Sequence, residues 1–151
     1  MSELIRDMSF RSKEERTLVR NVIDQHLVKT RELVDKVYYY ILKYLNEKRT
    51  RECSRTEIAR KLLDWGFVSG KNSYGQAYYR IKRLTEFGLI KPVRIEPADT
   101  TNPKGGGRRK EIFTLNISSS ACTFILKNIV EYLKNQVLLF ERGKTELDEV
   151  M

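Results

Sequence analysis

The chain has 151 residues, of which 40% are hydrophobic and 32% charged, and these fractions are typical of a globular protein. Its formal charge of +9 is confined to residues 48–110, which hold 16 Lys and Arg against 6 Asp and Glu, while the remainder holds 13 against 14. No stretch approaches the roughly 20 uninterrupted apolar residues of a membrane span, and residues 1–10 lack an apolar run behind a basic start. We expect one compact domain with helical extensions, soluble and cytoplasmic, whose basic centre favours a nucleic-acid partner.

The first predicted element is an amphipathic helix within residues 12–48. This stretch contains no Pro or Gly, and its apolar residues recur at intervals of three and four. The pattern allows one long helix or two helices with a break near Lys29 and Thr30. We expect residues 1–30 to form a helical arm available to a partner subunit, and the following apolar half to begin the main domain, residues 31–117.

A second helix is predicted to begin at Ser54. Glu57 stands three residues later, so the serine hydroxyl can accept the Glu57 amide while the carboxylate reaches back to the Ser54 amide, which makes a capping box. Gly66 follows at the C-terminal end, where helices commonly end with a residue in the left-handed backbone conformation. Residues 67–72 form a turn by composition. The expected buried stripe consists of Ile58, Ala59, Leu62, Leu63 and Trp65.

A third helix is predicted from Asn72 or Ser73 to Phe87, with Gly88 as its terminator. With Ile81 at the centre of the buried face and about 100° per residue, the residues within about 60° of it are Tyr74, Ala77, Tyr78, Leu84 and Thr85. The opposite face carries Asn72, Gln76, Tyr79 and Arg83, flanked by Arg80 and Lys82. Asn and Gln bond to adenine edges, Arg to guanine and Tyr to phosphate or a thymine methyl group. Gly75 beside this row leaves the backbone open to a close approach. The plainer interpretation is a solvated polar face.

Two strands are predicted next, at residues 89–95 and 111–117. Pro92 restricts the first to the edge of a sheet. The loop between them, residues 97–110, holds three consecutive glycines and the cations Lys104, Arg108, Arg109 and Lys110. A hairpin loop this long and glycine-rich is expected to become ordered on a partner, and its basic tip favours a polyanion over a merely solubilising role.

A last helix is predicted from the serines at 118–120 to about Arg142, before Gly143 and an acidic tail. Its apolar residues are spaced like a heptad repeat, at Cys122, Leu126, Ile129, Leu133, Val137 and Phe140. This stripe can pack on its own domain or on a second copy. Because a domain with three helices of its own already closes its core, we expect residues 118–151 to form a homodimer. The expected dimer interface is Leu126, Ile129, Leu133, Val137 and Phe140.

The cysteines and the single histidine argue against a metal site. Cys53 and Cys122 are 69 positions apart, and His26 is the only histidine. Structural zinc requires four such ligands, and a disulfide scaffold of this size uses more cysteines. We predict two free thiols, no metal and no cofactor.

In this order of elements the chain resembles the winged helix-turn-helix regulators of the MarR, PadR and ArsR kind. The likeness is carried by Ile-Ala-Arg-Lys-Leu at 58–62, Leu-Thr-Glu-Phe-Gly-Leu-Ile at 84–90, and Gly-Arg-Arg at 107–109 leading into 112–115. It covers roughly residues 33–117 and implies a mainly α fold with a small β-hairpin wing (α+β), extended here by long N- and C-terminal helices. In such families the third helix enters the major groove, the wing touches the minor groove or backbone, and flanking helices form a twofold dimer. The turn at 66–72 and the wing at 97–110 are longer than usual.

The function expected is therefore a sequence-specific double-stranded DNA-binding transcription regulator that acts as a homodimer. Major-groove contacts are assigned to Asn72, Ser73, Tyr74, Gln76, Tyr79, Arg80 and Arg83. Wing contacts are assigned to Lys104, Arg108, Arg109 and Lys110, and contacts to the flanking DNA backbone to Arg49, Arg51 and Arg55.

Two alternatives keep the same fold. One is a non-specific architectural, plasmid-partition or replication-origin DNA-binding protein, and the other is a winged-helix module that binds an acidic protein or RNA. An enzyme is not expected, because the chain has no paired His and carboxylate, and the glycines at 105–107 precede a strand rather than a helix. The sequence does not indicate whether a small-molecule effector binds.

Overall fold

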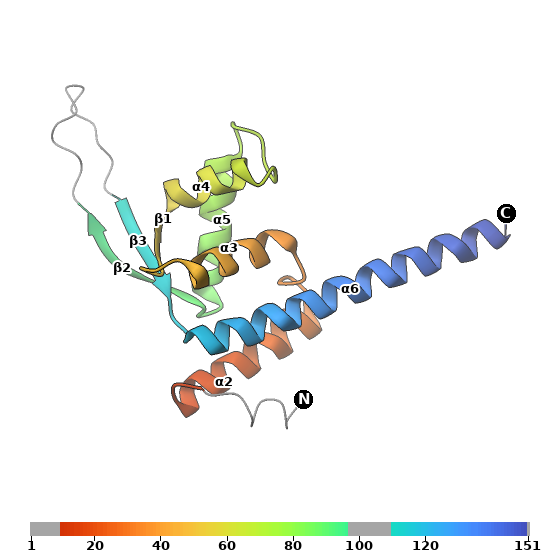
Figure 1. The fold of residues 1–151 in the computed structure, drawn as a ribbon, viewed down its shortest axis with the longest axis horizontal. Helices are drawn as coiled ribbons and strands as arrows, with labels where there is room; N and C mark the ends of the chain where they lie inside the picture. The colour runs from red at the N-terminus through yellow and green to blue at the C-terminus, as the bar shows by residue number, and fades with distance from the viewer. Residues whose placement is uncertain (1–9, 97–109, 151) are drawn as a thin grey trace. The chain divides into compact units, whose positions relative to one another are not determined.

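The computed structural model describes residues 10–96 and 110–150, with the side chains of the last helix described up to residue 135. The described part is mainly helical, with one small antiparallel sheet of three strands, which confirms the predicted α+β class (Figure 1). In chain order the elements are α2 (Lys13–Val22), the π-helix η1 (Ile23–Lys29), α3 (Lys36–Glu47), β1 (Glu52–Ser54), α4 (Arg55–Asp64), α5 (Ser73–Glu86), β2 (Ile90–Glu96), β3 (Lys110–Leu115) and α6 (Ser119–Val150).

The chain divides into two compact units. The helical unit consists of Met1–Leu42 with Ser119–Met151, and the central unit is Lys43–Ser118. The structure thus divides inside α3 and at Ser118, where the sequence placed boundaries at residues 30 and 117. The whole basic block, residues 48–110, falls within the central unit.

In the helical unit, the N-terminal helix is held at its start by a capping arrangement. The Ser12 hydroxyl accepts the Glu15 amide at 3.1 Å, and the Glu15 carboxylate accepts the Arg11 amide at 3.2 Å. Apolar side chains on one face of α2 and η1 are buried, as the periodicity predicted: Val19, Val22, Ile23 and Leu27. The helix ends beyond Lys29, where Arg31 adopts a φ of 59°. The segment at 12–48 therefore forms two helical stretches, with the break at the place that the sequence indicated.

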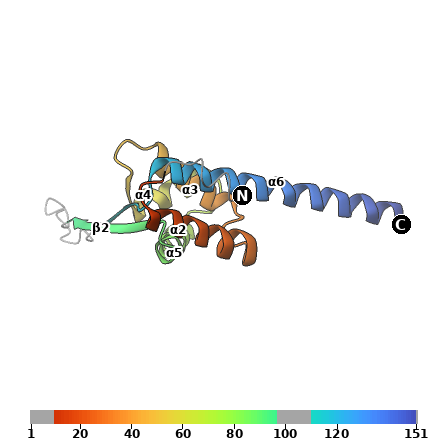
Figure 2. The same cartoon turned by 90° about the horizontal axis from the view of Figure 1, so that it is seen from below.

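The last helix packs beside α2 and η1 within the helical unit (Figures 1 and 2). Leu126 and Ile129 are buried there, so these two side chains have almost no exposed area to give to a second chain. This corrects their assignment to a dimer interface, because both side chains are already buried within the single chain. Leu133 is half-buried, and the side chains of Val137 and Phe140 lie outside the described residues.

The predicted end of this helix was also wrong, because α6 continues through Gly143 to Val150. A single Gly inside a helix costs only about 1 kcal/mol, and the residues that follow it include good helix formers.

In the central unit, the strands lie in the order β1-β3-β2, all antiparallel. β2 is an edge strand, as Pro92 required, and its register with β3 shifts between Pro92 and Arg94. β1 was not predicted from the sequence, since three residues are too few to show an alternating pattern. The loop before β1 is closed by Arg51, which adopts a φ of 57° and donates from Nη2 to the Ile117 carbonyl at 2.6 Å.

Helices α4 and α5 begin and end close to their predicted limits. The Ser54 hydroxyl accepts the Glu57 amide at 3.2 Å, and Gly66 and Gly88 adopt φ values of 80° and 85° at the two helix ends. The Glu57 carboxylate does not complete the capping box; its partners among the described residues are Tyr44 and Lys48.

The predicted buried faces of these two helices are only partly correct. Ile58, Ala59 and Leu62 of α4 are buried, as are Ala77, Ile81 and Leu84 of α5. Leu63 is 40% exposed and Trp65 half-buried, while Tyr74 and Tyr78 are 42% and 48% exposed. The helical wheel placed both tyrosines on the buried face, although Tyr74 was also assigned to the DNA contacts. They lie at the border of that face, beside the Arg55 guanidinium.

We expect Ser54→Ala to lower the free energy of unfolding by about 1 kcal/mol, because the Glu57 amide loses its acceptor at the start of α4. Urea unfolding followed by circular dichroism measures this loss. Ser69→Ala, at an exposed loop position, is the matched control and should leave the midpoint unchanged.

Candidate nucleic-acid interface

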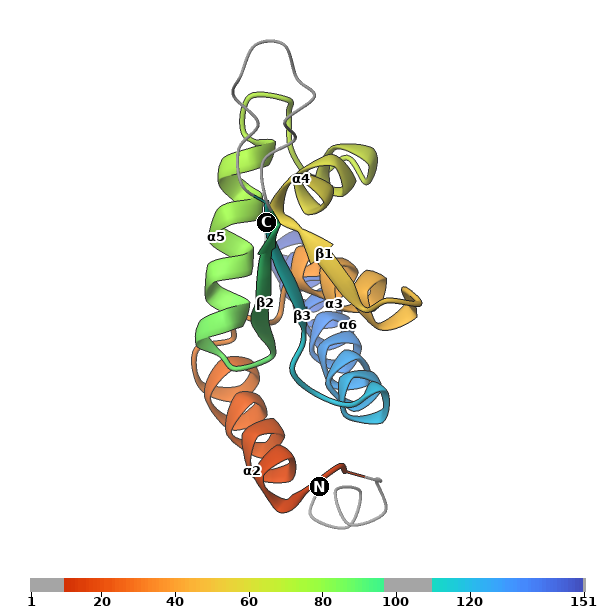
Figure 3. The same cartoon turned by 90° about the vertical axis from the view of Figure 1, so that its left-hand side faces the viewer.

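The outer face of α5 carries a row of exposed residues. Asn72, Gly75, Gln76, Tyr79 and Lys82 are exposed, while the opposite side of the helix is buried. In the central unit α5 lies beside β2 (Figure 3). Ser73, which the sequence analysis included among the contact residues, is only 7% exposed and donates its hydroxyl proton to the Gly70 carbonyl at 3.2 Å. Its hydroxyl therefore serves the turn before α5 rather than the open face.

The two arginines of the predicted row are less available than the sequence indicated. Arg83 forms an ion pair with Glu86, one turn further along α5, and its guanidinium lies 4.8 Å from the Phe87 ring centroid. Arg80 is half-buried. The exposed hydrogen-bonding groups consequently gather in the N-terminal half of α5, with Lys82 as the exposed cation near its middle.

Arg55, the first residue of α4, connects three elements of the central unit. Its guanidinium lies 4.5 Å from the Tyr78 ring centroid and 5.8 Å from that of Tyr74, both on α5. Its Nη2 lies 3.3 Å from the Glu111 Oε2 of β3. Cation–π contact with Tyr78 fixes the position of the positive charge, while the carboxylate of Glu111 partly neutralises it. The sequence predicted Arg55 as a contact residue but did not predict its partners Tyr78 and Glu111. These residues are distant in sequence and come together only in the folded chain.

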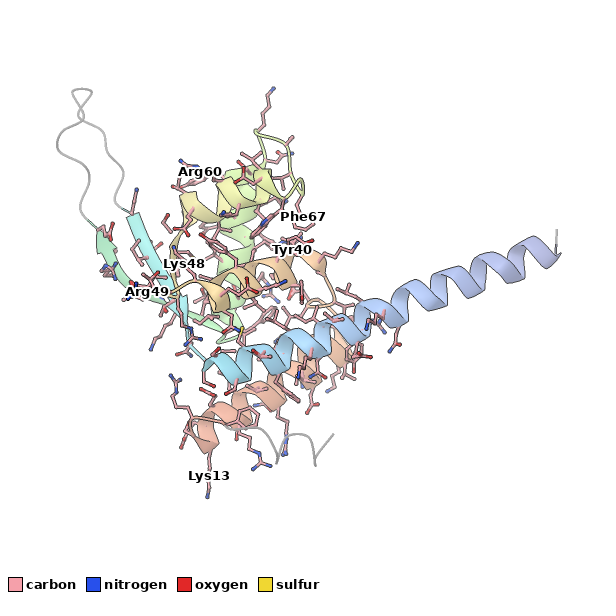
Figure 4. The ribbon with its side chains drawn as sticks, in the orientation of Figure 1. Lys13, Tyr40, Lys48, Arg49, Arg60 and Phe67 are labelled. Atoms are coloured by element: carbon pink, nitrogen blue, oxygen red, sulfur yellow. The ribbon has the colours of Figure 1, made fainter. Side chains whose placement is uncertain are left out.

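The remaining predicted contact residues fall into three groups. Arg49 is exposed where α3 has ended, next to Lys48 (Figure 4). Lys110 is exposed at the start of β3. Arg51 is turned into the fold, because its guanidinium binds the Ile117 carbonyl. This corrects its assignment to the DNA backbone. Lys104, Arg108 and Arg109 lie outside the described residues.

An open depression of about 260 Å³ lies over the sheet, between the strands and the end of α3. Most of its charged groups are paired with one another: Lys48 Nζ lies 2.5 Å from the Glu57 carboxylate, and Arg94 Nη1 lies 2.6 Å from the Glu52 carboxylate. Glu96, paired with Arg94, and Lys110 complete the charged lining. Cys53 lines it with a buried thiol. Because the lining holds three cations and three carboxylates, the depression offers no net charge of one sign for a ligand.

The pair of Lys48 and Glu57 sets the protonation of its neighbours. Burial raises the pKa of Glu57, but hydrogen bonds from Lys48 and Tyr44 outweigh that effect, so the pKa is lowered overall. Burial, together with the Glu57 charge, raises the pKa of Tyr44 above its ordinary value. Burial also raises the pKa of the Cys53 thiol to about 12, so this thiol is protonated and unreactive at neutral pH.

Neither a metal centre nor a membrane span emerges from the part of the chain that the structure describes. Over residues 10–96 and 110–150, no three His, Cys, Asp or Glu side chains gather in a way that could hold a metal ion. In the same ranges, no helix combines the length and the apolar character that crossing a bilayer requires.

Comparison of the chain with protein-family models, with curated proteins and with solved structures gives no match.

Because the folded-state pKa of Glu57 is lowered, its ionised carboxylate stabilises the protein above the ordinary carboxyl pKa, and this contribution disappears as the pH falls through the folded-state pKa. We expect Glu57→Gln to lower the urea midpoint clearly at pH 7 and much less at pH 3. Glu47→Gln, at an exposed position of α3, is the control. An equal loss at both pH values would contradict the assignment of the effect to the Glu57 charge.

Proposed function

We propose that the central unit is a winged helix-turn-helix module that binds double-stranded DNA, and that the protein is a sequence-specific transcription regulator. The observation that carries this proposal is the exposed face of α5, with Asn72, Gln76 and Tyr79 in one row and Lys82 beside it. These side chains offer the donors and acceptors that base edges and phosphates require. A helix of this kind in a block of net charge +10 favours a DNA groove over plain solvent.

The arrangement around α5 supports the same function. α4 precedes α5 with a capped N-terminus, and β2 and β3 follow it with the basic segment 97–110 between them. Arg55 stands at the first position of α4, fixed against the Tyr78 ring, which suits a contact with the DNA backbone. Further exposed cations of the central unit contribute to the electrostatic attraction: Arg49, Arg60, Lys71, Lys82, Lys91 and Lys110.

We also propose that the regulator is a homodimer. Since Leu126 and Ile129 are used within the monomer, the interface is assigned to the later part of α6, where the sequence continues with Leu133, Val137 and Phe140. A dimer would present two copies of α5 to successive half-sites, about 34 Å apart along the duplex.

The test is a fluorescence-anisotropy titration of the purified protein against duplex DNA from upstream of its own gene and against a random duplex, each at two salt concentrations. We expect tight, salt-sensitive binding, with the specific duplex bound roughly 10³-fold more tightly than the random one. Equal binding to both duplexes would favour the architectural or partition function. Absence of binding to either would overturn the DNA proposal and assign the basic surface to an acidic protein or RNA.

In the same assay we expect Gln76→Ala to weaken binding to the specific duplex about tenfold and to the random duplex little, because a bidentate amide contact reads a base. Lys82→Ala should weaken both duplexes alike and reduce the log–log salt slope by about 0.9, as one lost phosphate contact requires. Gln25→Ala, on η1 of the helical unit, is the matched control. Equal losses on the two duplexes for Gln76→Ala would contradict base reading by this residue.

A further expectation concerns the carboxylate that holds Arg55. Glu111→Gln removes a negative charge 3.3 Å from the guanidinium and leaves a similar shape, so binding to both duplexes should strengthen about two- to fivefold. Glu47→Gln controls for the change in net charge alone. If the two variants strengthen binding equally, the local pairing of Arg55 with Glu111 has no bearing on DNA.

A further inference from the structure

Gly75 is a glycine that the fold itself does not require. It is the third residue of α5, and it has none of the positive φ values that Gly66 and Gly88 use to end their helices. A Cβ atom built on Gly75 would meet no atom within 4 Å. A glycine inside a helix is less stable than an alanine, because it loses more backbone freedom on folding. In the described part of the central unit, no crowding of a Cβ accounts for a glycine at this position.

The residues around Gly75 on the helix surface are all larger. On an α-helix the neighbours of a position lie three and four residues away, which places Asn72 before Gly75 and Tyr78 and Tyr79 after it. Both tyrosines are 48% exposed. Gly75 therefore leaves the backbone bare between two exposed aromatic rings and an exposed amide, on the face of α5 that we propose to contact DNA.

The width of the DNA major groove makes the absence of a side chain at Gly75 important. An α-helix with its side chains is about 10–12 Å across, and the major groove of B-DNA is about 12 Å wide. A helix that enters such a groove fits with little clearance, so the size of the side chain at the deepest position decides how far the helix can enter.

We propose that Gly75 is the point of closest approach between α5 and DNA, and that its missing side chain sets the depth at which Asn72, Gln76 and Tyr79 reach the base edges. This inference rests on the proposed function and adds a specificity-determining residue to it. It makes the N-terminal half of α5, rather than the half that carries Arg83, the centre of the contact.

The test compares Gly75→Ala and Gly75→Leu in two measurements, thermal unfolding and anisotropy with the duplex that the native protein binds most tightly. Alanine and leucine are the better helix formers, so both variants should raise Tm by about 2–4 °C. Although the variants are more stable, their affinity for DNA should be lower, about threefold for Gly75→Ala and at least tenfold for Gly75→Leu. Gly70→Ala makes the same chemical change in the loop before α5, where a Cβ also meets no atom within 4 Å, and should leave affinity within twofold of the native value.

The possible outcomes separate this inference from the function on which it rests. Variants that are more stable and bind DNA as well as the native protein would overturn the inference and leave DNA binding intact. Variants with a lower Tm would also overturn it, because the glycine would then serve the fold. A native protein that binds no duplex would overturn the proposed function, and the inference with it.

Discussion

The central unit depends on one half-buried carboxylate, that of Glu57. It receives the Lys48 ammonium group at 2.5 Å and the Tyr44 hydroxyl, and so connects the segment that leaves α3 with the first turn of α4. A half-buried carboxylate without such partners would be costly, whereas here each donor is itself held, Lys48 by the Glu52 carbonyl at 2.7 Å. Because α4 packs on α5, the Glu57 carboxylate also helps to hold the helix against which α5 lies.

The charges of the central unit are less free than their number implies. Arg55, Arg83 and Arg94 each lie in an ion pair with a glutamate. Solvent-exposed pairs of this kind contribute little to stability, so a phosphate could replace the carboxylate at little cost. The pairs hold long side chains in defined positions, which would reduce the side-chain entropy lost if the proposed DNA contact forms.

Features set by local chemistry were predictable from the sequence. The Ser54 cap and the glycine ends at Gly66 and Gly88 depend on neighbouring residues, and the structure has them where the sequence placed them. Features that depend on distant residues were not predictable. A helical wheel gives the positions of Tyr74 and Tyr78 around the axis of α5 but does not reveal that Arg55 lies beside them. Likewise, the residues next to Arg51 in the sequence do not show that its guanidinium binds the Ile117 carbonyl. The apolar stripe of α6 was recognised, but its partner was not, because periodicity cannot distinguish a helix of the same chain from one of another.

The irregular edge of the sheet has a consequence for how copies of the chain can meet. β2 exposes Val93 and Ile95, 46% and 59% accessible, on a strand with only one hydrogen-bonded neighbour, and such a strand ordinarily invites another to pair with it. Pro92 supplies no amide hydrogen there, and the register shift beside it interrupts the regular spacing of donors and acceptors. At the other edge, β1 is only three residues long. The sheet is thereby protected against growing into a fibre, and association between copies is directed away from its edges.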